Sequence, residues 1–199
     1  MIAGQMQLGG GEALGFDRAL SQFHTPQPLA DRMAAWAGVS RNMRVLEPCA
    51  GGGNIARACM KLGAQVTAVE IDKRWADKMV ADPSLAGAEI AYGDFLRCKP
   101  GDLGPPHDLV VMNSPFEKQA DALFIAHAIT FAPRVVALDP VGVLFGKKKN
   151  ELVWSRRSLT GLVIITRRPK FLGSGGSFDC ALVEVDRAPG LPCRRVERW

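Results

Sequence analysis

The chain has 199 residues, of which 47% are hydrophobic, and a net charge of +5, which fits one compact domain with a sizeable core. No stretch is long and apolar enough to cross a membrane, and Met1–Gln5 lacks the start of a secretory signal, so we expect a cytoplasmic protein without membrane contacts. The five cysteines form no Cys-x-x-Cys pair, which favours reduced thiols in a cytosol and argues against zinc, so no bound metal is expected.

The order of apolar and turn-forming residues predicts alternating strands and helices. Residues 1–20 are glycine-rich and expected to be flexible. A helix is expected from Pro26 to Gly38, with Thr25 as its N-cap. Strands are expected around 44–47, 65–70, 88–91, 108–112, 134–139, 161–166 and 179–185, and helices at 54–62, 73–81 and 117–130. The alternation predicts a doubly wound α/β fold, with a mostly parallel seven-stranded sheet that ends in an antiparallel strand.

The first strand runs into a glycine-rich loop. The apolar pair Val45-Leu46 is followed by Glu47-Pro48-Cys49-Ala50 and three glycines, and a helix begins near Asn54. Glycines let a backbone approach a ligand closely at the start of a helix, and Gly51-x-Gly53-x-x-Ala by itself also fits a dinucleotide fingerprint. However, the carboxylate of Glu47 would repel a pyrophosphate and attract an ammonium or a sulfonium. The loop therefore favours a small cationic cofactor over a nicotinamide dinucleotide.

Two further strands end in acidic residues. Glu70 lies about 20 residues after the glycine loop, which is the spacing at which an acid meets ribose hydroxyls. Asp94-Phe95 ends the next strand, where the acid can accept from an adenine amino group and the ring can pack on the base. The plainer interpretations are a solvated strand end and an ordinary Gly-Asp turn. These strand ends agree with an adenosine-containing cofactor.

The segment Asn113-Ser114-Pro115-Phe116 follows the apolar run 108–112, which is typical of a buried strand. Ligands bind at the carboxyl ends of strands in open α/β sheets. The amide of Asn113 and the next backbone carbonyl can accept hydrogen bonds from an amino group, and the Phe116 ring can stack on a planar base. An isolated Asn-x-Pro is more often a turn, but the other motifs favour a site that holds an exocyclic amine for methylation.

Positive charge is concentrated between residues 147 and 170. This segment has eight basic residues and one acidic residue, a net charge of +7, which leaves residues 1–146 mildly acidic. A one-sided basic segment is typical of a polyanion-binding surface, whereas the plainer interpretation is a solvated loop. Trp154 lies among the basic residues, so we favour nucleic acid. The residues expected to contact it are Lys147, Lys148, Lys149, Arg156, Arg157 and Phe171.

In this order the motifs resemble those of class I S-adenosylmethionine-dependent methyltransferases that modify N6 of adenine, in the γ arrangement. Phe23-His24-Thr25-Pro26 resembles the N-terminal cofactor motif of the family, and Asn113 to Phe116 resembles its catalytic Asn/Asp-Pro-Pro-aromatic tetrapeptide. The resemblance covers about residues 20 to 185 and implies a Rossmann-like fold and S-adenosylmethionine as cofactor. The cofactor-binding residues it implies are Phe23, Thr25, Pro26, Glu47, Pro48, Ala50, Gly51, Gly53, Asn54, Glu70, Ile71, Asp94, Phe95 and Asn113.

The chain departs from this motif at Ser114, where the family usually has proline. The backbone carbonyl survives the change, but the stiffness that proline gives does not. The expected reaction is methyl transfer to the N6 amine of adenine in DNA, with Asn113, Ser114, Pro115 and Phe116 as the catalytic segment. RNA adenine and a protein glutamine amide are alternative acceptors, and a non-catalytic nucleic-acid-binding subunit is a further alternative that Ser114 supports. Cys49 follows proline as in cytosine-C5 methylation, but its place in the cofactor loop favours a structural role.

The expected organisation leaves little chain for target recognition. Residues 21–187 form the predicted methyltransferase domain, 188–199 a C-terminal tail, and no separate target-recognition domain is expected. Direct base readout needs an element that places several side chains in a groove. Specificity is therefore short and loop-borne, is supplied by a homodimer or a separate specificity subunit, or is loose.

Overall fold

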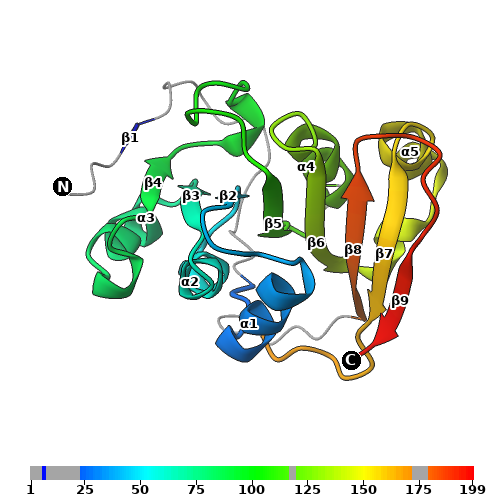
Figure 1. Cartoon of the computed structure of the whole chain (residues 1–199), viewed down its shortest axis with the longest axis horizontal. Helices are drawn as coiled ribbons and strands as arrows, with labels where there is room; N and C mark the ends of the chain where they lie inside the picture. The colour runs from blue at the N-terminus through cyan, green and yellow to red at the C-terminus, as the bar shows by residue number, and fades with distance from the viewer. Residues whose placement is uncertain (1–5, 8–22, 117–119, 172–178) are drawn as a thin grey trace.

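The computed structural model describes residues 6–7, 23–116, 120–171 and 179–199, and in this part of the chain one nine-stranded sheet forms the centre of the molecule (Figure 1). The strand order is β1-β4-β3-β2-β5-β6-β8-β7-β9. The strands are β1 (Met6–Gln7), β2 (Arg44–Glu47), β3 (Gln65–Glu70), β4 (Glu89–Tyr92), β5 (Leu109–Asn113), β6 (Arg134–Pro140), β7 (Ser158–Ile164), β8 (Cys180–Asp186) and β9 (Arg195–Arg198). All neighbouring pairs are parallel except those of β8 with β6 and β7.

Helices cover both faces of this sheet, which confirms the doubly wound, Rossmann-like α/β fold. The α-helices are α1 (Gln27–Trp36), α2 (Asn54–Lys61), α3 (Lys73–Val80), α4 (Ala120–Ala128) and α5 (Lys147–Lys149). Short turns of helix lie at η1 (Pro83–Leu85), η2 (Phe95–Arg97), η3 (Val141–Leu144) and η4 (Asn150–Trp154). Figure 1 shows α1, α2 and α3 on one side of the sheet and α4 on the other. None of the helices in the described residues could cross a membrane.

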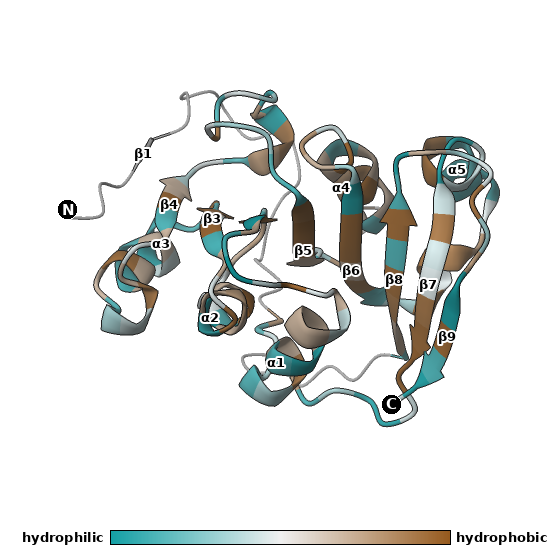
Figure 2. Ribbon diagram, viewed as in Figure 1, coloured by the Kyte–Doolittle hydropathy of each residue, from teal (hydrophilic) through white to brown (hydrophobic). Residues whose placement is uncertain are grey.

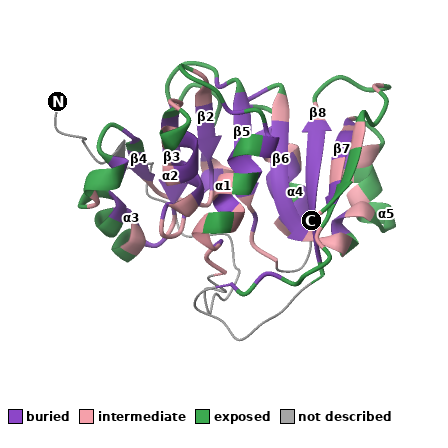
Figure 3. Ribbon diagram, turned by 60° about the horizontal axis from the view of Figure 1, so that its bottom comes forward, coloured by how far each residue is buried: buried purple, intermediate pink, exposed green. Residues whose placement is uncertain are grey.

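The central strands are apolar on both faces because both are covered. In β5, Leu109 and Val111 pack in the core cluster that contains α1, α2 and α3, whereas Val110 and Met112 pack in the cluster that contains α4. Such continuous apolar runs are typical of parallel strands buried on both sides. Figure 2 shows β5 as hydrophobic, and Figure 3 shows β5, β6 and β8 buried along their lengths.

The sheet differs from the sequence expectation at its two edges. The expected count of seven strands omits β1 and β9. The chain 195–198 reads Arg-Val-Glu-Arg and has no apolar run, because β9 is a largely exposed edge strand that joins the sheet through backbone pairing with β7. The antiparallel strand is β8, and it lies between β6 and β7 and not at the edge. The rest of the expected flexible segment 1–20 lies outside the described residues.

The segment expected as a tail, residues 188–199, therefore contains a strand. Side chains tie it to α1: the Trp36 indole donates to the Glu197 carboxylate at 2.9 Å, and the Arg195 guanidinium lies 3.7 Å from the centre of the Trp36 ring. Arg32 lies in the same way over the Trp199 ring, at 4.1 Å. These contacts join segments that are far apart in sequence, and this is why local pattern did not indicate them.

The helix cap at Thr25 is also a correction. α1 begins after Pro26, which takes the N-cap position with no side-chain cap. Proline at this point already has the backbone angle φ that a cap position accepts, and Thr25 uses its backbone carbonyl to accept a hydrogen bond from the Asn54 side chain at 2.6 Å. The N-terminal segment is therefore joined to the glycine loop by its backbone.

Gly161 of β7 is a site where added volume should cost stability. A Cβ atom there would lie 2.9 Å from the Trp36 ring and 2.9 Å from a Glu184 carboxylate oxygen. Because the indole is held by β9, it has little room to shift. We expect Gly161→Ala to lower the free energy of unfolding by about 1–3 kcal/mol, measured by urea unfolding. Gly142→Ala is the control because nothing lies within 4 Å of its Cβ position, and equal stability of the two variants would contradict the prediction.

Candidate active site

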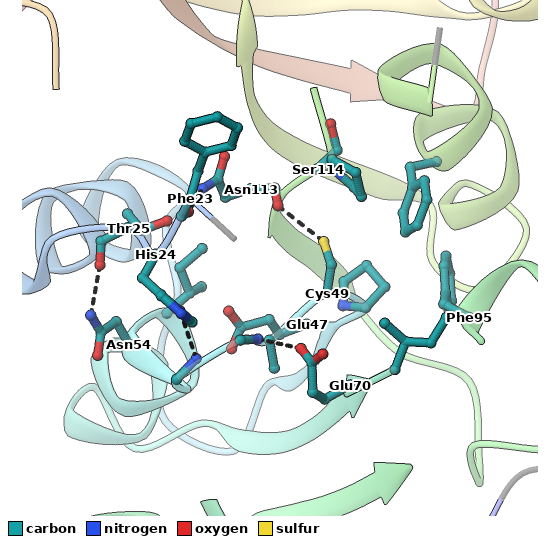
Figure 4. A pocket seen from close by; sticks show the side chains of 18 of the residues that line it. Phe23, His24, Thr25, Glu47, Cys49, Asn54, Glu70, Phe95, Asn113 and Ser114 are labelled. Atoms are coloured by element: carbon teal, nitrogen blue, oxygen red, sulfur yellow. Dashed lines mark hydrogen bonds between the residues drawn. The ribbon is translucent and has the colours of Figure 1, made fainter. Parts of the chain in front are cut away.

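A pocket opens at the carboxyl ends of β2, β3, β4 and β5. The strand order reverses between β2 and β5, and such a switch point leaves a crevice above the sheet. The pocket brings together strand ends that are separated by 21 residues or more in the sequence, and Figure 4 shows Glu47, Glu70 and Asn113 around it. The lining residues are Phe23, His24, Thr25, Glu47, Pro48, Cys49, Ala50, Gly51, Gly52, Asn54, Ile55, Glu70, Ile71, Gly93, Asp94, Phe95, Asn113, Ser114, Pro115 and Phe124.

The glycine loop is held from two sides. The Gly51 N–H donates to a Glu70 carboxylate oxygen at 2.6 Å, and the Gly52 N–H donates to His24 Nδ1 at 3.1 Å (Figure 4). Gly51 has a φ of 53°, and a Cβ atom there would lie 2.7 Å from His24 Nδ1. Glycine is therefore required at this position both for its backbone angle and for the approach of the histidine ring.

His24 is a pocket residue that the sequence motifs did not single out. Its ring lies 4.3 Å from the ring of Trp75. Burial lowers the pKa of His24, and the positive charge of Lys78 lowers it further, so the neutral imidazole accepts from Gly52 through Nδ1. His24 lies within the motif Phe23–Pro26 but was not among the expected cofactor-binding residues. Its hydrogen bond with the glycine loop depends on the folded structure.

Two buried carboxyl groups form the floor of the pocket. Glu47 accepts from the Ala56 N–H at 2.7 Å, and Glu70 accepts from the N–H groups of Gly51 and Asp72 at 2.6 and 2.7 Å. Burial raises the pKa of Glu47 well above its usual value, and burial also raises the pKa of Glu70. Backbone N–H groups offset part of this effect. A cation in the pocket would favour both ionised forms, so the floor fits a positively charged ligand.

Asp94 and Phe95 lie at the end of β4, where the sequence placed them. Asp94 caps η2, and one of its oxygens accepts from the Leu96 N–H at 3.1 Å. The Phe95 ring packs in the core with its centre 5.0 Å from that of Phe131, although the residue also lines the pocket. The expected contact of Phe95 with an adenine ring stays a prediction. The described structure shows its packing in the core.

Asn113 ends β5, and its side-chain amide makes a hydrogen bond through one of its two polar atoms in the described structure. Its side-chain Nδ2 donates to the Phe23 carbonyl at 2.7 Å, which fixes the orientation of the amide because that carbonyl can only accept. Within the described part of the chain, Asn113 Oδ1 is buried and has no hydrogen-bond partner. The Cys49 thiol donates to the Asn113 backbone carbonyl at 3.1 Å, and burial raises the pKa of this thiol, so Cys49 is a protonated donor.

An aromatic cluster of Phe23, Phe116 and Phe171 adjoins Asn113. The rings of Phe23 and Phe116 stack with centres 5.3 Å apart and an angle of 22° between their planes. The Phe171 ring meets both edge-on, at 5.7 Å from Phe23 and 5.6 Å from Phe116. Phe171, which the sequence grouped with the basic segment, is buried in this cluster. The fold therefore places it beside the expected acceptor site.

Two of the expected cofactor-binding residues do not line the pocket. Pro26 caps α1, and Gly53 begins α2 with a φ of 74°. A Cβ atom at Gly53 would lie 2.8 Å from a Leu85 methyl group and 3.0 Å from the Met79 sulfur atom. The third glycine of the loop is therefore required by the packing beneath α2, and its expected contact with a cofactor stays a prediction.

The basic segment is only partly available as a surface. Lys147, Lys148 and Arg156 are exposed, and Arg157 is half-buried. Contrary to the expectation, Lys149 forms an ion pair with the buried Asp121 of α4. The contrast follows from the helical turn, which directs neighbouring lysines to different sides.

Two aromatic residues near this segment also differ from the sequence expectation. Trp154 is half-buried, and its indole donates to the Val143 carbonyl at 3.0 Å, which anchors the ring to η3. Phe145 precedes the lysines and has 66% of its surface exposed, and no sequence signal singled it out. The exposed aromatic residue beside the lysines is therefore Phe145 and not Trp154.

No protein-family model matches the chain. A ribosomal RNA small subunit methyltransferase A of Novosphingobium aromaticivorans is 36% identical over 104 residues, which cover 50% of this chain and 37% of that relative. The match thus spans well under half of the relative.

No group of three His, Cys, Asp or Glu side chains in the described residues could hold a metal ion.

Solved structures show the same architecture. A candidate RNA methyltransferase from Pyrococcus horikoshii superposes with a TM-score of 0.72 and 20% identity, covering 89% of this chain and 94% of that one. A dimethyladenosine transferase from Plasmodium falciparum superposes with a TM-score of 0.61 and 17% identity, covering 83% and 63%. The chain therefore has the Rossmann-like fold of class I S-adenosylmethionine-dependent methyltransferases.

Proposed function

We propose that this protein is an S-adenosylmethionine-dependent methyltransferase that modifies the N6 amine of adenine in nucleic acid. The observation that carries the proposal is the buried Oδ1 of Asn113, which lies at a strand end beside the pocket and has no hydrogen-bond partner among the residues that the structure describes. A buried acceptor without a donor is costly, so its retention supports a ligand that supplies the donor. An exocyclic amine is such a donor, and it has two hydrogens to give.

The part of the pocket that Glu47, Glu70 and Asp94 line, here called the lower pocket, fits the cofactor. Glu47 and Glu70 provide a negative floor for its cationic groups, and Asp94 provides an acceptor at the end of β4. The glycine loop lies close to the pocket without side chains that would fill it. When bound, S-adenosylmethionine supplies an electrophilic methyl group. The protein residues bind it and exclude water from its reactive end.

The part of the pocket beside Asn113 and Ser114, here called the upper pocket, holds the acceptor in this proposal. In the proposed arrangement, Asn113 Oδ1 accepts one hydrogen of the amine and the Ser114 carbonyl accepts the other, which localises the lone pair on nitrogen. Catalysis is then by positioning and electrostatics, with no covalent link to the protein. Phe116 stacks on the flipped base. Because Phe23 covers one face of the Phe116 ring, a base that stacks on that face has to displace Phe23.

An exposed surface beside this pocket suits a polyanion. Phe145, Lys147 and Lys148 follow β6 at the same edge of the sheet as Asn113, and the ion pair of Lys149 with Asp121 fixes this segment against α4. We propose that the two exposed lysines contact phosphates and that the Phe145 ring stacks on a base that flanks the target.

The acceptor nucleic acid is proposed to be RNA. The sequence motifs favoured DNA, but the relative from Novosphingobium aromaticivorans is a ribosomal RNA methyltransferase, and a protein of similar fold is a dimethyladenosine transferase. DNA is the alternative acceptor, and the methyl-transfer experiment below tests both nucleic acids. A protein glutamine amide is less supported, because the exposed lysines have no role there. A homodimer or a specificity subunit, and a cytoplasmic location, belong to the same proposal. The non-catalytic alternative predicts nucleic-acid binding without methyl transfer.

Cofactor binding should depend on the glycine loop. We expect S-adenosylhomocysteine, the demethylated product, to bind the wild type, and Gly51→Ala to weaken binding by about 1–3 kcal/mol because the new Cβ atom displaces His24. Isothermal calorimetry measures both. Gly87→Ala, which also has a positive φ but has open space around it, is the matched control. Binding of a nicotinamide dinucleotide instead would exclude this cofactor assignment.

Methyl transfer should depend on Asn113. We expect Asn113→Ala to abolish transfer of a tritiated methyl group while cofactor affinity stays near that of the wild type, because the amide faces the acceptor. The substrates are total RNA and plasmid DNA in parallel, followed by nucleoside analysis for N6-methylated adenosine.

Asn150→Ala, at an exposed asparagine, is the control for the Asn113 variant. Methylation of DNA and not RNA would return the acceptor to the sequence-based expectation. Binding of RNA by a wild type that transfers no methyl group to either substrate would favour the non-catalytic alternative.

The exposed lysines and Phe145 should differ in their salt dependence. Lys147→Gln with Lys148→Gln should reduce the slope of log affinity against log salt by about 0.7–0.9 per lost phosphate contact. Phe145→Ala should weaken RNA binding by about 1–3 kcal/mol with no change in slope, since stacking releases no counterions. Fluorescence anisotropy measures both. Arg41→Gln with Arg194→Gln removes the same charge before β2 and β9, and an equal effect there would show a non-specific charge effect.

A further inference from the structure

Ser114 has a specific partner in the core. Its hydroxyl donates a hydrogen bond to Oδ1 of Asp139, near the end of β6 (Figure 4 shows Ser114 above the pocket). The register pairs Asn113 with Leu138, so the next residue of each chain segment, Ser114 and Asp139, come side by side. The contact thus links the second position of the catalytic segment to the neighbouring strand.

The buried position of Asp139 is unfavourable for the stability of the fold. It has no exposed surface, and its second oxygen, Oδ2, has no hydrogen-bond partner among the described residues. Burial, together with the negative charge of Asp121, raises the pKa of Asp139 to about 7, although the Ser114 hydroxyl and Lys149 oppose this rise. A buried carboxylate with one hydrogen bond is less stable than an apolar side chain that fills the same space. Stability of the fold therefore does not account for Asp139.

The charged groups around Asp139 compensate its charge only in part. Asp121 on α4 raises the pKa of Asp139, and Lys149 of α5 lowers it but forms its ion pair with Asp121. The thiols of Cys49 and Cys180 also face it, and the negative charge of Asp139 raises the pKa of each. The most direct partner of Asp139 is therefore the Ser114 hydroxyl.

Ser114 needs such a partner because it is not proline. In the motif that the segment resembles, a proline ring fixes φ at this position, whereas serine leaves it free. A hydrogen bond to a charged acceptor on a rigid strand can restrict the same backbone. The carbonyl of this residue is the second proposed acceptor for the substrate amine, and small displacements of such an acceptor cost rate.

We propose that Asp139 is a positioning residue for methyl transfer, which holds Ser114 so that its carbonyl faces the acceptor amine. The inference rests on the proposed function, since it concerns the same site. It differs from a packing role in a way that can be measured: Asp139 should affect the turnover number and not the affinity for cofactor or nucleic acid.

The test uses Ser114→Ala and Asp139→Val, which remove the donor and the acceptor respectively, and Asp139→Asn, which keeps an acceptor oxygen. We expect the first two to lower kcat by about tenfold to a hundredfold, with KM for RNA and the calorimetric affinity for S-adenosylhomocysteine unchanged. Asp139→Asn keeps a neutral acceptor, so its kcat should lie between those of the wild type and Asp139→Val. Thermal unfolding should show that Asp139→Val is at least as stable as the wild type.

A double-mutant cycle separates positioning from packing. Ser114→Pro supplies the stiffness without the hydroxyl, so Ser114→Pro with Asp139→Val should recover the kcat that Asp139→Val loses alone. An Asp139→Val variant equally impaired in both backgrounds would overturn the inference. If Asp139→Val does not fold, the comparison of Ser114→Ala with Ser114→Pro decides, because the inference requires the first to be impaired and the second to be active.

The pH profile gives an independent measurement. Because the pKa of Asp139 is raised to about 7, kcat of the wild type should fall as pH is lowered through 7, since a neutral carboxyl is a weaker acceptor. The profile of Asp139→Asn should lack this limb, and an unchanged limb would count against the inference. A wild type without any methyl transfer would instead refute the proposed function, whereas an active wild type with unaffected variants would refute only the role of Asp139.

Discussion

The carboxylate of Glu70 is the contact on which the rest of the site depends. It accepts from Gly51 of the first loop and from Asp72 at the start of α3, and so fixes two loops to the end of β3. The Gly51–Gly52 segment then meets His24, which brings the N-terminal segment over the pocket. One buried carboxyl group thus connects the glycine loop, the start of α3 and the N-terminal segment. Backbone N–H groups offset part of the cost of burying it.

A similar arrangement recurs at the end of β5, two strands from β3 in the sheet. Asn113 is joined to the N-terminal segment through the Phe23 carbonyl, and the Cys49 thiol supports the Asn113 carbonyl from the first loop. Both contacts use groups that are neutral, whereas the pocket floor uses acids. The site is thus divided into a lower half that favours a cation and an upper half that presents neutral acceptors. This division is what a methyl donor and an amine acceptor require, and it supports the proposed assignment of each half.

Buried polar groups near the site have partners of unequal number. The acids of the floor each accept backbone hydrogen bonds, whereas Asn113 Oδ1 and Asp139 Oδ2 have none among the described residues. Such incomplete satisfaction is rare in stable cores and is concentrated at functional positions. The unpartnered atoms of Asn113 and Asp139 therefore agree with the ligand contact and the positioning role proposed for these two residues.

The sequence by itself determined the central strands, the order of the motifs and most residues of the pocket. Apolar runs such as 108–112 are local signals, and carboxyl ends of parallel strands meet at one edge whatever the connections between them. It did not determine contacts between distant segments. The histidine clamp on Gly52, the inward turn of Lys149 and the edge strand β9 depend on which side chains meet in space. Only the tertiary structure decided these, because burial and pairing energies arise between segments that local patterns treat separately.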